Sequence, residues 1–516
     1  MHHFTPPRPI TAAMQQETYG AAEIELDDAP RDYGRANSKP FGRTSLPHGV
    51  ALIGGFGSYA LVVNNISGPG MLDFPQAFQA AGWLPCVLCI LGVAAVSAAV
   101  ACALSDAHAS LRKEKASHAT NPTSRTRAGR WRARSWKEVQ SDSVEFSEMF
   151  GAAYGGTIFR GTQFLYFLNL FSQNVAAIVT TAQATDSMVA ALFGYSYALN
   201  VPHMTIESWE GCKREGCVPF RLAAPGLLLT AGYAFCFLTL GPLGFFTLQE
   251  NMLAQKISFV LLVALTLQFL AYFVTSPTPS RVALVGPRPW DVVGVVIFNF
   301  AFCVTVPAWL NEKVPSVNAK KTIWAACLSS AVAYCLVGWL GGVAIARASD
   351  NVLDELTSSL APTSVRLGGG IFAFAIIGLG VPVYCVLMRY NLRAGGLSEF
   401  WSHILAGAGP WAVSWLVYRG HGILEVLSWS GLILNAGIDF IAPMVLVLHS
   451  TSTRSNASRF RRGDSLGPHD HARAAMLLMI VVVLVATGLV LKLYEAFNGI
   501  GGDIADQVHG DVTPDS

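Results

Sequence analysis

Charged residues are scarce in this sequence. Asp, Glu, Lys and Arg make up 13% of its 516 residues, whereas apolar residues make up 52%. An ordinary globular chain is about 25% charged, and half that share cannot cover the surface of a soluble protein of this length. The net charge of +2 also lacks the strong basic excess typical of nucleic-acid binding. The composition therefore excludes a soluble enzyme and a disordered scaffold, and leaves a polytopic membrane protein.

Several motifs of catalysis and energy coupling are missing as well. No Lys follows a Gly, so there is no phosphate-binding loop, and no H-E-x-x-H zinc motif occurs. Residues 463–467 read GDSLG, a hydrolase-like pattern, but a nucleophile elbow needs a strand before it and a helix after it. This match lies between two apolar spans. We predict that the chain is not an enzyme and that it uses no metal or cofactor, although a proton gradient remains an energy source.

Eleven apolar segments approach or exceed the roughly 20 residues that a helix needs to cross a bilayer core. They are 51–81, 83–106, 157–190, 223–243, 253–274, 290–310, 323–345, 367–390, 401–418, 423–449 and 475–494. The segment 401–418 is the shortest of them.

Basic residues in the loops predict the orientation of these spans. With the N-terminus inside, the internal loops hold 20 Lys and Arg and the external loops hold 8. We therefore predict a disordered cytoplasmic tail over 1–50, which has no signal-peptide pattern, and a transmembrane domain over 51–494. Residues 107–155 form a basic cytoplasmic loop, 191–222 an external loop, and 495–516 a short external tail.

The first span contains a predicted break. It is too long for one straight helix and is interrupted by Ser67-Gly68-Pro69-Gly70. Pro69 lacks an N–H and clashes with the preceding turn, and glycine destabilises a helix. Because lipid does not tolerate unpaired backbone groups, an irregular segment at this depth must face a protein cavity.

Such a break offers two kinds of backbone group to a ligand. The N–H groups around Gly68–Met71 suit a carboxylate, and the carbonyl groups near Asn65 and Ile66 suit a cation or an ammonium group. Broken helices of this kind are typical of substrate sites in secondary transporters. A proline kink without any ligand is the competing interpretation.

Four stretches of the chain resemble one family. NNISGPGMLDFPQAFQAAGW resembles the first helix of the amino acid/auxin permease family, within the amino acid–polyamine–organocation superfamily. Stretches beginning EFSEMFGAAYG, FNFAFCVTVPAWL and GPWAVSWLVYRG resemble its third, sixth and ninth-to-tenth helices, in family order from Ile53 to Leu448. The resemblance implies an all-α polytopic membrane protein with eleven helices, in which a 5+5 inverted repeat is followed by one extra helix. It also implies an amino-acid-like substrate.

In an inverted repeat the sixth span is the partner of the first. Pro307 frees a carbonyl group one turn earlier, near Cys303, so a break around Ala301–Thr305 would face the first one. Phe300 and Phe302 would then line the site, or they would instead face lipid. The predicted substrate-binding residues are Asn65, Ile66, Ser67, Gly68, Gly70, Met71, Phe300, Phe302, Cys303 and Thr305.

Energy coupling is predicted from what the eighth span lacks. Between Leu367 and Val383 it has no Ser, Thr, Asn or acidic residue, so side-chain oxygens for a sodium ion are missing. Transport coupled to protons, or uncoupled transport, is therefore favoured. Asp73 and Lys256 are candidate proton carriers, unless each is simply a hydrated residue at a helix end.

Other polar residues leave alternatives open. Cys212 and Cys217 lie in a polar loop and form either a disulfide or two free thiols. Asn169 and Asn174 of the third span either contact the ligand or join helices to one another.

We expect a secondary transporter of amino acids or close analogues that works by alternating access. The alternative is an amino-acid sensor with the same fold and little flux. The expected partners are the small-molecule substrate and the lipid bilayer, with no nucleic acid. The plasma membrane and a vacuolar, lysosomal or other endomembrane remain equally open, as does the oligomeric state.

Overall fold

The computed structural model describes residues 53–120, 143–201, 203–211, 219–220, 226–275, 281–345, 352–357, 361–418, 433–449, 472, 475–483, 485–487 and 490. All of them belong to one compact unit, residues 51–516. Cys212 and Cys217, the tail 1–50 and the tail 495–516 lie outside the described residues, so the predictions for them stay predictions.

The chain is a helical integral membrane protein. Every one of the eleven predicted spans contains a described helix. Within the described ranges, six helical stretches are long and apolar enough to cross a membrane: 83–113, 156–193, 252–274, 292–312, 319–344 and 363–394. On α8 (Met252–Val274), Leu253, Leu267 and Val274 are 62% to 68% exposed. Apolar surface of this kind marks a face that contacts lipid.

The first span is broken where the sequence predicts. It consists of α1 (Gly55–Ile66), the 3₁₀ turn η1 (Pro69–Asp73) and α2 (Phe74–Ala81). The α-helix ends because Pro69 has no N–H to continue the ladder.

The sixth span is broken in the same manner. It consists of α9 (Val292–Asn299), the short turn η3 (Cys303–Thr305) and α10 (Val306–Glu312). Pro307 lies in the first turn of α10, where a missing N–H has no cost. Both predicted breaks are confirmed.

The two broken helices run in opposite directions. Ile53 N donates to Glu312 O at 2.8 Å, so the start of α1 meets the end of α10. Gly286 N donates to Ala81 O at 2.7 Å, so the end of α2 meets the segment that leads into α9. This antiparallel relation is the one that an inverted repeat predicts for its first and sixth spans.

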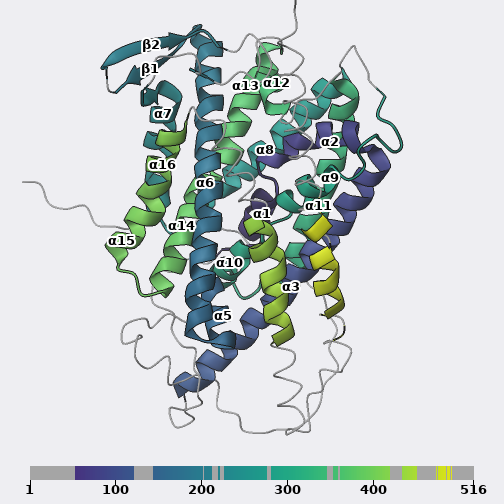
Figure 1. The fold of residues 1–516 in the computed structure, drawn as a ribbon, viewed down its shortest axis with the longest axis vertical. Coiled ribbons are helices and arrows are strands. Elements are labelled where there is room, and N and C mark those ends of the chain that lie inside the picture. The colour runs from purple at the N-terminus through teal and green to yellow at the C-terminus, as the bar shows by residue number, and fades with distance from the viewer. Residues whose placement is uncertain are drawn as a thin grey trace, which may run out of the picture. The chain divides into compact units, whose positions relative to one another are not determined.

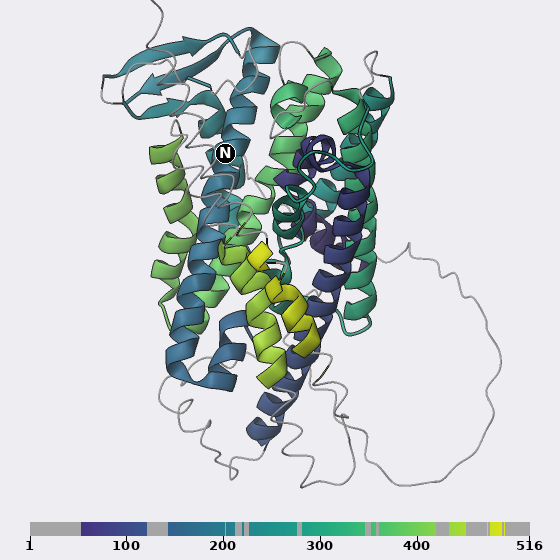
Figure 2. The same cartoon turned by 45° about the vertical axis from the view of Figure 1, so that its right-hand side comes forward.

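Other long helices enclose the two breaks (Figures 1 and 2). The helix α11 (Ala319–Ala344) packs against α2 and α3 (Trp83–Thr120), and α14 (Gly380–Ala394) packs against α6 (Gly156–Phe193). The remaining described elements are α5 (Phe146–Tyr154), α7 (Ala231–Leu240), η2 (Pro242–Phe245), α12 (Val352–Thr357), α13 (Thr363–Phe372), α15 (Glu399–His403), α16 (Gly409–Val417) and two apolar helices, Ile433–His449 and Ala475–Thr487.

In the part of the chain that the structure describes, three of the spans contain a π-helical turn: η4 (Ala373–Gly378), η5 (Ile404–Ala408) and η6 (Ala436–Ile441). A π turn inserts an extra residue and rotates the side chains around it. Such turns often occur at functional sites.

The predicted cytoplasmic loop 107–155 differs from the structure at both of its ends. The helix α3 continues through Thr120, and α5 occupies residues 146–154. No Gly or Pro interrupts residues 107–120, and Lys, Glu and Ala are strong helix formers. Charged residues end the apolar stretch there, but they do not end the helix.

The predicted external loop 191–222 contains strands, which the all-helical prediction missed. The strands β1 (Ser196–Asn200) and β2 (Thr205–Trp209) pair antiparallel, and β3 (Leu228–Thr230) pairs with the other edge of β1. Figure 1 shows β1 and β2 beside α7, at the end of the bundle opposite α5. A short run with alternating burial gives a weaker sequence signal than a span of 20 apolar residues.

Candidate functional site

The two helix breaks lie against each other. A Cβ atom placed on Gly70 would collide with the side-chain amide of Asn299, so the first break contacts the end of α9 directly. Asn65 Nδ2 donates to Thr305 Oγ1 at 3.4 Å, which joins α1 to η3. The structure thus brings together the two sets of residues that the sequence singled out.

Gly68 is the place where the first break is open. A Cβ atom on Gly68 would meet no other atom within 4 Å, and Gly68 and Asn65 are both partly exposed. The amide N–H groups nearby are partly used within the chain. Gly68 N donates to Ile66 O at 2.9 Å, and Met71 N donates to Gly68 O at 3.3 Å.

The end of α1 is held by α11, which the sequence did not predict. Tyr334 OH donates to Ile66 O at 2.6 Å, and Ser67 Oγ lies 3.3 Å from Ser330 Oγ. The Ile66 carbonyl, one of the predicted ammonium contacts, therefore accepts two hydrogen bonds, from Tyr334 OH and from Gly68 N, and both of its lone pairs are used within the chain.

Phe300 and Phe302 of the sixth span do not face lipid. Phe300 and Phe302 are fully buried, as are Met71 and Cys303. The ring of Phe300 lies edge-on to Tyr334 at 5.5 Å. They pack between helices next to the two breaks, so the lipid-facing alternative is wrong.

A buried carboxylate that the sequence reasoning missed meets the second break. Asp439 of η6 is fully buried, and its Oδ1 accepts from Val304 N at 2.9 Å. The amide of Cys303 faces the same carboxylate. An acidic residue inside an apolar span is a functional candidate by default, and that signal could have identified Asp439.

Amide side chains link Asp439 to the third span. Asn169 lies beside the carboxylate, and Gln173 Nε2 donates both to Asn169 Oδ1 at 3.1 Å and to Asn435 Oδ1 at 2.6 Å. Gln173 therefore joins α6 to the span that contains Asp439, and Asn169 lies next to the break. Asn174 donates to Cys385 Sγ at 3.2 Å, which is a contact between helices.

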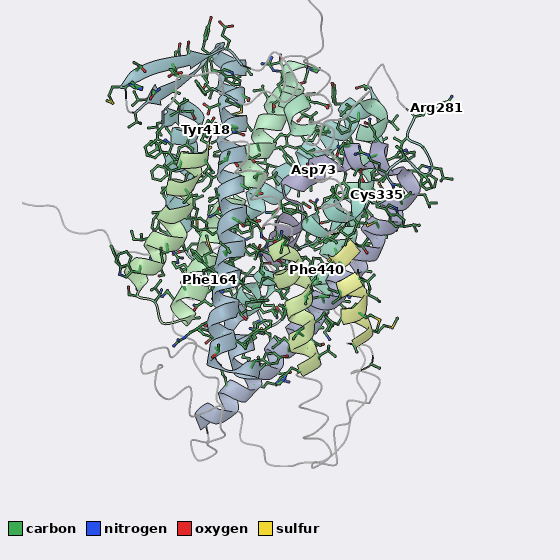
Figure 3. All side chains as sticks on the ribbon, viewed as in Figure 1. Asp73, Phe164, Arg281, Cys335, Tyr418 and Phe440 are labelled. Atoms are coloured by element: carbon green, nitrogen blue, oxygen red, sulfur yellow. The ribbon has the colours of Figure 1, made fainter. Side chains whose placement is uncertain are left out.

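The two predicted coupling residues occupy different surroundings. Asp73, labelled in Figure 3, ends η1 and is partly exposed. Its carboxylate acts on the hydroxyl of Tyr334. Lys256 is exposed on α8. Burial was the reason for expecting Lys256 to lose its proton, and the structure does not bury it.

A second fully buried acid, Asp186, joins elements at the sheet end of the bundle. Asp186 Oδ1 accepts from Ser196 Oγ at 2.6 Å and from Gly232 N at 2.8 Å. Its Oδ2 accepts from Thr230 Oγ1 at 2.5 Å and from Tyr418 OH at 2.6 Å. Both carboxylate oxygens are therefore satisfied.

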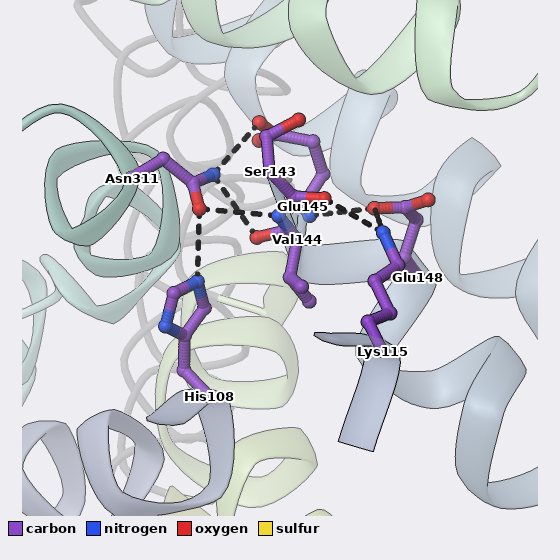
Figure 4. Close-up of polar contacts among 7 residues, drawn as sticks. All are labelled: His108, Lys115, Ser143, Val144, Glu145, Glu148 and Asn311. Carbon is purple, nitrogen blue, oxygen red and sulfur yellow. Dashed lines mark hydrogen bonds and ion pairs between the residues drawn. The ribbon is translucent and has the colours of Figure 1, made fainter. Parts of the chain in front are cut away.

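The opposite end of the bundle is tied by Asn311 at the end of α10 (Figure 4). Asn311 Oδ1 lies 3.1 Å from His108 Nε2 and accepts from Val144 N at 3.1 Å. Asn311 Nδ2 donates to Val144 O at 3.2 Å and to Glu145 Oε1 at 3.1 Å. The second half of the sixth span is thereby fastened to α3 and to the start of α5.

Glu145, the residue preceding α5, lies outside the membrane-spanning segments. Burial raises its pKa from an ordinary value of 4.5 to about 8, and the charges of Glu148 and Glu312 act in the same direction. The hydrogen bond from Asn311 and the charge of Lys115 oppose that rise. Glu145 is therefore largely protonated at neutral pH.

Comparison with known proteins identifies no family. No family model matches the chain, and no curated protein matches it. Similar solved structures include the manganese transporter of Eremococcus coleocola in complex with an aromatic bis-isothiourea substituted compound, at 13% identity and a TM-score of 0.48, covering 87% of this chain and 89% of that chain.

Two mutant forms of that transporter are also similar. One has 11% identity, a TM-score of 0.44, and coverage of 88% of this chain and 97% of that chain. The other has 13% identity, a TM-score of 0.39 and the same coverage. Similarity at this level supports no statement about the substrate of this chain.

Proposed function

We propose that this chain is a secondary active transporter that moves amino acids or close analogues across a membrane by alternating access. One observation carries the proposal: two antiparallel broken helices meet at their breaks, with open space at Gly68. A membrane protein that binds no ligand gains nothing from two facing breaks, because each break exposes backbone groups that a continuous helix would satisfy.

The backbone at the breaks supports a zwitterionic substrate. The backbone N–H groups at the start of η1 form the positive end of a helix dipole, which suits a carboxylate. The carbonyl of Asn65, near the end of α1, suits an ammonium group, because the residue four positions on is Pro69, which has no N–H to donate to it. The constant part of an amino acid would use these two groups, in agreement with the resemblance to amino acid/auxin permeases. The substrate side chain would extend toward Thr305.

The ties at the two ends of the bundle support alternating access. Asn311 fastens α10 to α3 and α5 at one end, and hydrogen bonds join the end of α2 to the segment before α9 at the other. Each hydrogen bond contributes only about 1 kcal/mol net, so ligand binding can shift the balance between closing one end and closing the other. Catalysis is not part of this proposal.

Counterflow in liposomes tests the function. Purified protein is reconstituted into vesicles loaded with one unlabelled amino acid at a time, and uptake of the labelled form is measured. Gly68→Val should lose counterflow, because its side chain would fill the open space at the break.

Gly54→Val is the matched control. Gly54 also has an extended backbone, with φ −75° against −80° for Gly68, and a Cβ atom there would also meet nothing within 4 Å. It precedes α1 and lies away from the break, so this variant should exchange substrate as the wild type does. Equal counterflow in both variants would contradict the site, and uptake of a metal ion but of no amino acid would contradict the substrate class.

The same vesicles separate transport from sensing. A sensor of this fold would bind an amino acid in detergent and show no counterflow. Binding without flux would therefore replace the proposed function by its alternative.

A further inference from the structure

The inference concerns the carboxylate of Asp439. It lies in the π-helical turn η6, and its Oδ1 accepts from Val304 N at 2.9 Å. Its Oδ2 is fully buried and has no hydrogen-bond partner among the described residues. Asn169 lies beside the carboxylate, and Asn169 Nδ2 is likewise buried without a partner in that set.

Among the described residues, the other groups that face Asp439 carry no positive charge. The titratable side chains that face it are Tyr166 of α6, Cys303 of η3 and Tyr384 of α14. All three are ordinarily neutral at pH 7. Within the described part of the chain, no Lys or Arg forms an ion pair with Asp439.

An ionised carboxylate in these surroundings lacks compensation. Burial of a charge is costly unless a counter-charge and hydrogen bonds satisfy it. Among the described residues Asp439 Oδ2 has neither, and the side-chain amide beside the carboxylate is that of Asn169. The group therefore needs a cation for part of its working cycle. A sodium ion or an ammonium group would need space and several oxygen ligands, whereas a proton reaches a fully buried oxygen with no room of its own.

We propose that Asp439 is the proton-carrying group of this transporter, an inference that rests on the proposed function. One O–H bond forms at Oδ2 when a proton arrives from the side of higher proton activity. The same bond breaks when the proton leaves toward the other side. No oxidant or reductant takes part.

Protonation reaches the substrate site through Val304. A neutral acid accepts hydrogen bonds less strongly than a carboxylate does, so protonation loosens the bond from Val304 N to Oδ1. Val304 lies in η3, whose Thr305 accepts from Asn65 of the first break. Protonation of Asp439 therefore weakens a hydrogen bond that fixes the second break, one of the two breaks that would contact the substrate.

Asp439 differs from both residues that the sequence offered for this role. Asp73 is partly exposed and Lys256 is exposed, so water or lipid headgroups can stabilise their charges. Asp439 alone of the three combines full burial with direct contact to a helix break.

The experiment compares driven uptake with exchange. In vesicles with an inward proton gradient of about one pH unit, coupling to one proton permits roughly tenfold accumulation. Wild-type protein should approach that ratio. Asp439→Asn should lose the accumulation, while counterflow at equal pH persists at a reduced rate.

Asp106→Asn is the matched control. Asp106 is an exposed acid on α3 that forms an ion pair with Lys320 of α11 at 2.8 Å, and neither residue belongs to a break. It should accumulate substrate as the wild type does. Accumulation by Asp439→Asn equal to that of the wild type would overturn the inference while leaving the proposed function intact.

Two further measurements cover the remaining outcomes. If Asp439→Asn does not fold, Asp439→Glu should shift the pH midpoint of driven uptake, and an unshifted midpoint would overturn the inference.

If the wild type shows no counterflow, the proposed function fails, and infrared spectra then decide the proton site. A protonated-carboxyl band in the wild type that is missing from Asp439→Asn supports the inference, and identical spectra overturn it.

Discussion

Asp186 and Asp439 are both fully buried in apolar spans, yet their hydrogen bonding differs. Asp186 accepts from four donors, on β1, β3, α7 and the end of α16, and both of its oxygens are satisfied. Asp439 accepts from the backbone of the sixth-span break through one oxygen, and the other oxygen has no partner among the described residues. A fully satisfied acid fixes the elements around it, whereas a half-satisfied one responds to a cation. Both acids are buried, so the number of hydrogen-bond donors distinguishes the structural acid, Asp186, from the acid that we propose to bind and release a proton, Asp439.

The largest expected effect on stability comes from removing the carboxylate of Asp186. Asp186→Ala leaves four buried donors without their acceptor, and we expect a loss of stability on the order of 3–5 kcal/mol. Thermal unfolding of detergent-solubilised protein measures it. Asp186→Asn keeps one acceptor oxygen and should lose less. If Asp186→Ala unfolds at the wild-type temperature, the structural role of Asp186 is wrong.

The next effect tests the contact between the two breaks. Gly70→Ala places a methyl group against the amide of Asn299, and overpacking of this kind costs about 1–3 kcal/mol. Adding Asn299→Ala to the same chain should restore much of the stability. Gly68→Ala, which meets nothing within 4 Å, is the control and should unfold close to the wild type. A similar loss in both glycine variants would show that the breaks do not touch as described.

A third buried acid, Glu145, extends the comparison to the opposite end of the bundle. Its pKa is raised from 4.5 to about 8, so between those values the folded chain holds a proton that the unfolded chain has released. The folded state then binds more protons, and this group makes stability fall as pH rises through that window. Glu145→Gln removes the titration and keeps an acceptor for Asn311.

We therefore expect Glu145→Gln to gain stability over the wild type as pH rises from about 5 to 8, reaching about 1–3 kcal/mol at the upper end. Unfolding temperatures across this range measure the gain. Asp106→Asn, at an exposed ion pair, should show no such trend. Parallel pH curves for Glu145→Gln and the wild type would place the pKa of Glu145 in its ordinary range.

The smallest expected effect is on stability at Asp439. Asp439→Asn keeps a carbonyl oxygen for Val304 N and removes a charge that lacks compensation, so the free energy of unfolding should change by less than about 1 kcal/mol. Unfolding at neutral pH measures this beside Asp186→Asn. A destabilisation as large as that of Asp186→Ala would make Asp439 a second structural acid and remove the contrast.

The sequence predicts the breaks well because their causes are local. Gly68, Pro69 and Gly70 interrupt a helix wherever it packs, and Pro307 marks the start of α10. The side chains that contact the breaks could not be predicted from the sequence. Tyr334 on Ile66 and Asp439 on Val304 join positions more than a hundred residues apart, and no spacing in the sequence connects them.

The sequence by itself determined that this chain crosses a membrane many times and that its first and sixth spans are interrupted, because apolar runs, Pro and Gly act over one or two helical turns. Only the tertiary structure decided which polar groups meet. It set the breaks antiparallel against each other, gave Asp186 four donors, and left Asp439 with one oxygen unpartnered among the described residues. Hydrogen bonding between spans depends on how helices rotate and pack, and the π turn at Asp439 is one such rotation that composition does not encode.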